Sequence, residues 1–207
     1  MTRRMREPEF RAQQLKELYA PHVKPLNKLV DEYRGGGGRR VPHVAPMHGG
    51  VTARLMWLGS DPGPRTEVDR TQDDFLCVEN DDAGSARLGA LLKRAGIDAA
   101  DTCPWNACPW YVDREPGAVD LRAGLEPLRR VLELLEQLEV LILLGSVAER
   151  SWSAFRSTYP GDTGWFTVLP THGIGDEDQA ATNAQRHQVR EEQAAVFLEA
   201  GLLLRAA

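Results

Sequence analysis

Hydrophobic residues form short continuous runs at some places in the chain and helical stripes at others. The runs 55–58 and 140–144 are uninterrupted and each is followed by a glycine, which is typical of strands buried on both faces of a parallel sheet. Residues 165–169 predict another strand. The segment 103–111 is rich in proline and aromatic residues, which indicates either a strand end or a rigid loop.

Between these runs, apolar residues spaced three or four positions apart predict helices. The expected helices cover residues 83–95, 121–138, 146–157 and 183–203, with two shorter ones within 7–34. Gly96 is the expected stop of the first of these, and residues 41–50 are expected to form a loop. This order predicts an α/β fold of three layers, with helices on both faces of a central, mostly parallel four-stranded sheet.

Composition predicts a soluble protein of one compact unit. The chain has 207 residues, 42% hydrophobic and 27% charged. We expect N-terminal helices and a glycine-rich linker over residues 1–40 and the main domain over residues 41–207. No apolar run approaches the roughly 20 residues that cross a membrane, and no apolar segment follows the basic N-terminus as in a secretory signal. Three cysteines, an odd number, favour reduced thiols in the cytoplasm, and a monomer is expected.

Charge is unevenly distributed along the chain. The net charge is −5, yet residues 1–54 hold eleven Lys and Arg against five Asp and Glu. A locally basic face on an acidic protein is compatible with nucleic-acid binding without predicting it. The arginines that flank the four glycines at 35–38 indicate either a phosphate-contacting loop or a solvated linker.

Polar side chains follow three of the expected strands. Asp61 comes after the first strand, Asn106 lies in the proline-rich segment, and His172 follows the last strand. Because the carboxyl ends of parallel strands gather at one edge of a sheet, we expect these three side chains to share a pocket. Phe75 follows the first of them closely.

These residues, in this order, resemble the motif set of the uracil-DNA glycosylase superfamily. The resemblance covers roughly residues 50–200 and rests on Gly59-Ser60-Asp61-Pro62-Gly63, Phe75, Asn106, Gly145-Ser146-Val147-Ala148 and His172. It implies the fold of that superfamily and a monofunctional DNA glycosylase, which cleaves the bond between deoxyribose and a base and leaves an abasic site. DNA is the implied partner, single-stranded or with the base extruded from a duplex.

The resemblance also implies roles for individual residues. Asp61 would stabilise the sugar cation and orient water, and His172 would donate a hydrogen bond to the departing base. Asn106 would read the Watson–Crick edge of the base, and Phe75 would stack on its ring. The remaining candidates line the base pocket (Gly59, Ser60, Pro62 and Gly63), contact DNA phosphates (Arg39, Arg40 and Arg65) or form an apolar wedge (Ile174).

The chain departs from the superfamily pattern at two places. Uracil-strict members have a tyrosine at the position of Gly63, where its ring blocks substituents at C5 of the pyrimidine. A glycine leaves that space open, although members with glycine there usually have asparagine at the position of Asp61. Family members also continue the histidine as His-Pro-Ser, whereas here Gly173 and an acidic loop follow His172. The expected substrate is therefore uracil or a C5-modified pyrimidine, in base-excision repair or in defence against phage with modified DNA.

Other interpretations stay open on the sequence alone. In these interpretations Asp61 caps a turn, Asn106 satisfies the backbone groups of a tight loop, Phe75 packs in a core and His172 has a structural role. The chain would then be a catalytically silent nucleic-acid-binding module, or an N-glycosidase acting on free nucleosides or nucleotides. The cysteines lack the spacing of an iron–sulfur site, and Cys103 and Cys108 with His172 lack a fourth zinc ligand. No cofactor or metal is expected.

Overall fold

The computed structural model of the protein describes residues 3–35, 40–63 and 75–206. The helices are α1 (Pro8–Lys16), α2 (Lys24–Gly35), α4 (Ala83–Ala95), α5 (Ala118–Leu134), α6 (Gly145–Thr158) and α7 (Asn183–Ala206), joined by short 3-10 turns η1 (Arg4–Arg6), η2 (Gly50–Thr52), η3 (Ala99–Asp101) and η4 (Asp176–Gln179). The strands are β1 (His43–Val44), β2 (Leu55–Gly59), β3 (Phe75–Leu76), β4 (Thr102–Asn106), β5 (Val140–Leu144) and β6 (Thr167–Thr171).

The central sheet has four strands in the order β4-β2-β5-β6, and all pairs in it are parallel. Its two edge strands are the ones that carry proline, Pro104 in β4 and Pro170 in β6. Proline lacks the N–H that an inner strand must donate, so the chain places it where one side of the strand has no partner to serve. The prediction of an α/β fold around a parallel four-stranded sheet is confirmed.

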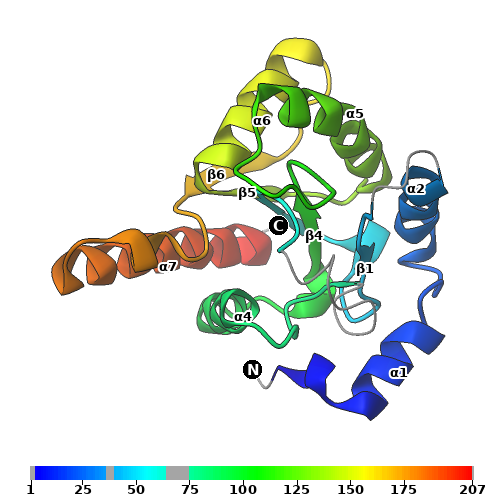
Figure 1. The fold of residues 1–207 in the computed structure, drawn as a ribbon, viewed down its shortest axis with the longest axis horizontal. Helices are drawn as coiled ribbons and strands as arrows, with labels where there is room; N and C mark the ends of the chain where they lie inside the picture. Colours follow the sequence, from blue (N-terminus) through cyan, green and yellow to red (C-terminus); the bar gives the residue numbers. More distant parts are fainter. Residues whose placement is uncertain (1–2, 36–39, 64–74, 207) are drawn as a thin grey trace.

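Side chains of the inner strands alternate between two cores. Met56 and Leu58 of β2 pack in a core with residues of α2, α5 and α6. Leu55 and Trp57 point the other way, into a core formed with residues of α4 and α7. Figure 1 shows α5 and α6 on one side of the sheet and α4 and α7 on the other. The fold therefore has three layers.

The N-terminal helices join the same core instead of forming a separate unit. Val23, Leu26 and Val30 are fully buried, and they lie in the cluster that contains Met56 and Leu58. The strands β1 and β3 form a second, two-stranded parallel sheet. Helix α1 packs beside it through Phe10, which lies in one cluster with Phe75 of β3. The segment that was expected to be only a loop thus contains the strand β1, which pairs His43 with Phe75.

Several predicted boundaries are confirmed and others shift. Strand β5 and helix α4 have the expected limits, and Gly96 ends α4 with a φ of 68°. Strand β6 begins two residues late, because its first ladder bond runs from Thr167 N to Glu139 O. Helix α5 begins at Ala118, since Asp120 accepts a hydrogen bond from the backbone N–H of Gly117 and so starts the helix early.

Close helix packing fixes the loop that follows β4. A Cβ atom at Gly124 of α5 would lie 2.0 Å from the carbonyl oxygen of Ala107. Only a glycine lets the helix approach this backbone so closely, and the loop immediately follows Asn106. In the part of the chain that the structure describes, no helix is long and apolar enough to cross a membrane.

Candidate active site

The ends of β2 and β4 are tied together beyond the strands themselves. In the parallel register Gly59 lies opposite Asn106. The pairing continues past the strands, with Ala107 N donating to Gly59 O at 2.9 Å and Cys108 N to Ser60 O at 2.8 Å. These bonds hold the backbone of the Asp61 loop beside the backbone that follows Asn106.

A cavity of about 440 Å³ opens at this edge of the sheet. It takes residues from the ends of β2, β4 and β5 and from the loop after β6. Its polar lining consists of Ser60, Asp61, Asp82, Ser85, Asn106 and Asp176, and its other lining of Trp57, Gly59, Gly63, Gly84, Leu88, Leu144, Gly145, Val147, Gly173 and Ile174. Asp61 and Asn106, which were predicted to share a pocket, therefore both line one cavity.

Asn106 faces this cavity without a partner. Its relative exposure is 9%, and its side chain makes no hydrogen bond with any described residue. A Cβ atom at position 59 would lie 2.6 Å from Asn106 Oδ1, so Gly59 makes room for the amide. The amide therefore has its donor and acceptor available to a ligand in the cavity.

Asp61 is a half-buried carboxylate in the loop that follows β2, and it lines the cavity. Burial raises its pKa above the ordinary value for aspartate, against the opposite effects of hydrogen bonds from the Ser60 hydroxyl and the Val112 backbone. The Ser60 Oγ atom donates to Asp61 Oδ1 at 2.8 Å. The carboxylate thus has a fixed orientation and stands in a less polar setting than water.

Two further carboxylates line the cavity, and each accepts a hydrogen bond from a nearby backbone N–H group. Asp82 caps α4, accepting hydrogen bonds from Ser85 N and Ser85 Oγ, both at 2.7 Å. Asp176 accepts one from Gly173 N at 2.6 Å. Among the described lining residues there is no lysine, arginine or histidine. The cavity therefore disfavours phosphate and favours groups that present N–H donors.

His172 lies at the end of β6 but points away from this cavity. Its Nε2 atom is 2.6 Å from Glu192 Oε2 of α7, and 42% of its side chain is exposed. The loop is held in this position by the buried Gln193, which donates to the carbonyl oxygens of His172 and Gly173 at 3.2 and 2.7 Å. The prediction that the imidazole shares the pocket with Asp61 and Asn106 is thus not met in this conformation.

Phe75 is also away from the cavity. It is 3% exposed and packs with Met5, Phe10, Ala45 and Cys77 in a small cluster of its own. The reason is that β3 pairs with β1, outside the central sheet. The ring predicted to stack on a base is therefore in a core, and Trp57 supplies the aromatic surface among the described lining residues.

The remaining predicted residues divide into three groups. Gly59, Ser60, Gly63 and Ile174 line the cavity. Pro62 is buried beside it, and Arg40 precedes β1, but neither belongs to its lining. Arg39 and Arg65 lie outside the described residues.

Sequence reasoning missed Asp176, Ser85 and Gln193. Gln193 had a detectable signal, because it is a polar residue on the buried stripe of α7 that also holds Ala194 and Phe197. Such a position needs hydrogen-bond partners, here the loop after β6. Asp176 had no comparable signal. The loop after His172 contains three carboxylates, and the sequence does not indicate which of them lines the cavity.

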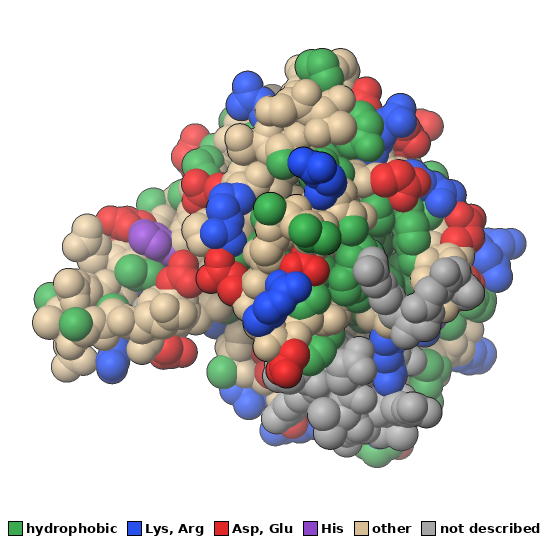
Figure 2. Space-filling view, turned by 45° about the horizontal axis from the view of Figure 1, so that its top comes forward, with side chains coloured by type: hydrophobic (Ala, Val, Ile, Leu, Met, Phe, Trp, Pro, Cys, Tyr) green, Lys and Arg blue, Asp and Glu red, His purple; other side chains and the backbone are tan. Residues whose placement is uncertain are grey.

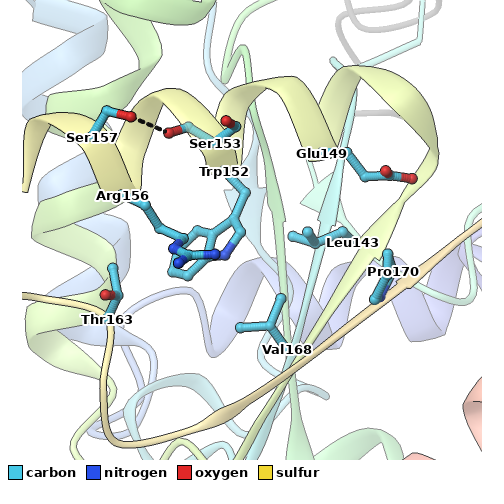
Figure 3. A pocket seen from close by; sticks show the side chains of 9 residues that line it. All are labelled: Leu143, Glu149, Trp152, Ser153, Arg156, Ser157, Thr163, Val168 and Pro170. Atoms are coloured by element: carbon cyan, nitrogen blue, oxygen red, sulfur yellow. Dashed lines mark hydrogen bonds between the residues drawn. The ribbon is translucent and has the colours of Figure 1, made fainter. Parts of the chain in front are cut away.

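A larger hollow lies elsewhere, between α6 and the edge strand β6. It measures about 740 Å³, and Figure 3 shows Trp152, Arg156 and Val168 around it. Leu143 of β5 and Pro170 of β6 line it, but no residue at the carboxyl end of β2 or β4 does, whereas the smaller cavity takes residues from the ends of β2, β4 and β5. Since ligand sites of parallel sheets lie at the carboxyl ends of their strands, the smaller cavity is the better candidate.

Nothing in the cavity suggests a metal centre. Within the described ranges, no three His, Cys, Asp or Glu side chains are grouped so that they could hold a metal ion. The three cysteines form no disulfide and are buried, and burial raises the pKa of Cys77 and of Cys103 to about 12. A neutral, buried thiol is a poor nucleophile and a poor metal ligand.

The raised pKa of Asp61 predicts a stability effect. The folded state binds this proton more tightly than the unfolded state, so ionisation of Asp61 at neutral pH costs folding free energy. We expect Asp61→Asn to raise the free energy of unfolding near neutral pH. The gain should be constant above the folded-state pKa of Asp61 and shrink as the pH falls from there to the lower unfolded-state pKa, below which the wild-type carboxyl is neutral in both states. Urea unfolding across this pH range measures it. A less stable variant at neutral pH would instead show that the carboxylate merely caps a turn.

Comparison with known proteins identifies the family of the chain. A family model described as the uracil DNA glycosylase superfamily matches residues 46–189. Among solved structures, the chain is similar to wild-type Pedobacter heparinus SMUG2, at 12% sequence identity and a TM-score of 0.46, over 87% of this chain and 85% of that chain. No curated protein sequence gives a significant match. Because the family model covers more than half of its length, the chain belongs to the uracil DNA glycosylase superfamily.

Proposed function

We propose that the protein is a monofunctional DNA glycosylase that hydrolyses the N-glycosidic bond of an extruded pyrimidine. The observation that carries this proposal is the buried amide of Asn106, which has no partner and faces the same cavity as the Asp61 carboxylate. An amide offers one donor group and one acceptor, which is what the Watson–Crick edge of a pyrimidine requires. The activity needs one chain and no cofactor, and we assign it to the cytoplasm.

In the proposed reaction the C1′–N bond breaks first, and its electron pair leaves with the base. The ionised Asp61 stabilises the positive charge that develops on the sugar, and it orients the water that attacks C1′. The new C1′–O bond forms from the water oxygen, and the water proton passes to Asp61 or to the base. No lysine lines the described part of the cavity, so a Schiff base and strand cleavage are not part of the proposal.

The departing base also needs stabilisation of its negative charge. Helix α6 begins at Gly145 and has no side-chain cap, and Gly145 and Val147 line the cavity. The unpaired N–H groups of its first turn would face the base, together with the Asn106 amide. His172 would contribute only in a conformation in which its contact with Glu192 has opened.

The lining also bears on which base is accepted. Three carboxylates supply acceptors, which favours a base with an amino group over one with carbonyl oxygens at the same places. Among the residues that the structure describes, none has a heavy atom within 4 Å of a Cβ atom built on Gly63, so these residues leave space for a substituent beside it. We therefore favour a C5-modified cytosine over uracil. Such bases occur in phage DNA, which makes antiviral defence the preferred role and base-excision repair the alternative.

The direct test offers oligonucleotides that contain uracil, hydroxymethyluracil, hydroxymethylcytosine or glucosylated hydroxymethylcytosine, followed by alkali to cut at abasic sites. We expect alkali-dependent breaks, strongest at a modified cytosine. Asp61→Asn should lower the rate of base release by roughly 10²- to 10⁴-fold while leaving oligonucleotide affinity intact. Asn106→Ala should weaken discrimination between bases.

Two outcomes would count against this proposal. Base release from free nucleosides but not from oligonucleotides would identify a nucleoside N-glycosidase. Binding of oligonucleotides without release of any base, equally strong in wild type and Asp61→Asn, would identify a silent binding module.

The open space at Gly63 gives a second prediction. Gly63→Tyr should keep activity on unsubstituted pyrimidines and lower that on C5-substituted ones by roughly 10- to 200-fold, the effect of steric exclusion from a pocket. Gly63→Ala is the matched control, because a methyl group there meets no atom of the described residues within 4 Å. Competition between two labelled oligonucleotides measures the ratio of kcat/KM. An unchanged ratio in Gly63→Tyr would show that the C5 substituent lies elsewhere.

A further inference from the structure

The loop after β6 presents a carboxylate to the candidate active site in place of the donor that was expected there. His172 points to Glu192 of α7, whereas Asp176, four positions later, lines the cavity. The Oδ2 atom of Asp176 accepts a hydrogen bond from Gly173 N at 2.6 Å. Its Oδ1 atom accepts none from any residue that the structure describes. This oxygen is therefore available to an occupant of the cavity.

Three contacts fix the turn that carries Asp176. Within the turn, Asp176 N donates to Gly173 O at 3.2 Å. From α7, the buried Gln193 donates to the same carbonyl oxygen at 2.7 Å. From α6, the backbone comes so close that a Cβ atom built on Gly145, whose φ is 85°, would lie 3.0 Å from Gly173 Cα. The carboxylate is thus held in place before a ligand binds, which limits the entropy lost on binding.

Arg87 of α4 is a cationic neighbour of this turn outside the cavity lining. It donates to Gln193 at 2.6 Å, and the negative charges of both Asp176 and Asp178 act on it. Asp178 is exposed and lines the neighbouring groove between α4 and α7 instead of the cavity. The two aspartates therefore share an electrostatic neighbour, but only Asp176 lines the cavity.

The other two carboxylates of the cavity are already engaged. Both oxygens of Asp82 accept hydrogen bonds from Ser85 at the start of α4. Asp61 accepts one from the Ser60 hydroxyl, and the proposed reaction uses this carboxylate at the sugar. Of the three, Asp176 is therefore the one best placed to contact the base.

The Asn106 amide does not by itself distinguish a cytosine-type from a uracil-type base. No described residue hydrogen-bonds its side chain, and an amide turned by 180° exchanges its donor and its acceptor. Surface charge does not distinguish them either, because both bases are neutral, and Figure 2 shows acidic and basic side chains interspersed on the face that it displays. An ionised carboxylate can only accept, so it discriminates where an amide does not.

We propose that Asp176 accepts a hydrogen bond from the exocyclic amino group of the extruded base, which makes 4-amino pyrimidines, the cytosine class, the substrates of this site. This inference rests on the proposed function and deepens it, because it assigns the choice between two classes of base to one side chain. A uracil-type base would place its O4 carbonyl against the carboxylate, and two acceptors that face each other leave both without a partner. Asn106 then donates to N3 of the cytosine ring.

The test measures affinity for two oligonucleotides that differ in one functional group. Hydroxymethylcytosine and hydroxymethyluracil carry the same C5 substituent, but C4 carries an amino group in the first and a carbonyl oxygen in the second. The parent protein is Asp61→Asn, so that catalysis plays no part, and each short single strand competes with a fluorescent one. We expect the parent to bind hydroxymethylcytosine more tightly. Adding Asp176→Asn should shift the ratio of the two Kd values towards hydroxymethyluracil by roughly 10- to 150-fold, the effect of one hydrogen bond to a charged group.

Asparagine is the substitution of choice because it keeps the turn. Its side-chain oxygen can still accept the hydrogen bond from Gly173 N, while its NH₂ group replaces Oδ1 and so turns an acceptor into a donor. Asp178→Asn is the matched control, since it removes the same charge near Arg87 from a residue outside the cavity lining. The control should leave the ratio unchanged. Thermal unfolding checks that all variants fold.

The possible results separate this inference from the glycosylase activity. A preference for hydroxymethylcytosine that Asp176→Asn reduces or reverses supports the inference, even if the wild type releases no base from any oligonucleotide. A parent without a preference would overturn it, even if base release is normal. So would a ratio that Asp176→Asn leaves unchanged, or one that Asp178→Asn changes equally.

Discussion

The parallel pairing of β2 with β4 and β5 is the constraint on which the site depends. It brings Gly59, Asn106 and Leu144 to one edge, and two further backbone hydrogen bonds carry the β2–β4 pairing into the loops beyond the strands. Asp61 and Asn106 are 45 positions apart in the sequence, and it is this register that brings them to the same cavity. A slip of β4 by one residue would reverse the face of every side chain in that strand and turn Asn106 from the cavity.

The acidic lining of the cavity is the second organising feature. Asp61, Asp82 and Asp176 line it, and none of its described lining residues is a lysine, arginine or histidine. Under the proposed function, only the neutral base and its sugar would enter this carboxylate-lined space, and the phosphates would stay outside it. The acidic loop after His172 belongs to this lining, because Asp176 faces the cavity and holds the loop through Gly173.

The strand ends could be predicted from the sequence because glycine and proline punctuate the apolar runs, and the buried runs leave few alternatives. The partners of His172 and Phe75 could not. The imidazole of His172 hydrogen-bonds Glu192 of the later helix α7. Phe75 belongs to β3, which pairs with β1 in a small sheet whose strands have only two residues each. Strands that short carry no periodicity, and a hydrogen bond between a loop histidine and a later helix has no local signal in the sequence. Gln193 stood on an apolar stripe and was the one missed residue with a readable pattern.

The most direct measurement of the central claim is a crystal structure of Asp61→Asn with an oligonucleotide that carries the preferred base. The account predicts the base inside the strand-end cavity, its edge hydrogen-bonded to the Asn106 amide and its C5 substituent directed to the space at Gly63. A base that stays stacked in the strand, or that binds elsewhere while the Asn106 amide remains unpaired, would contradict it.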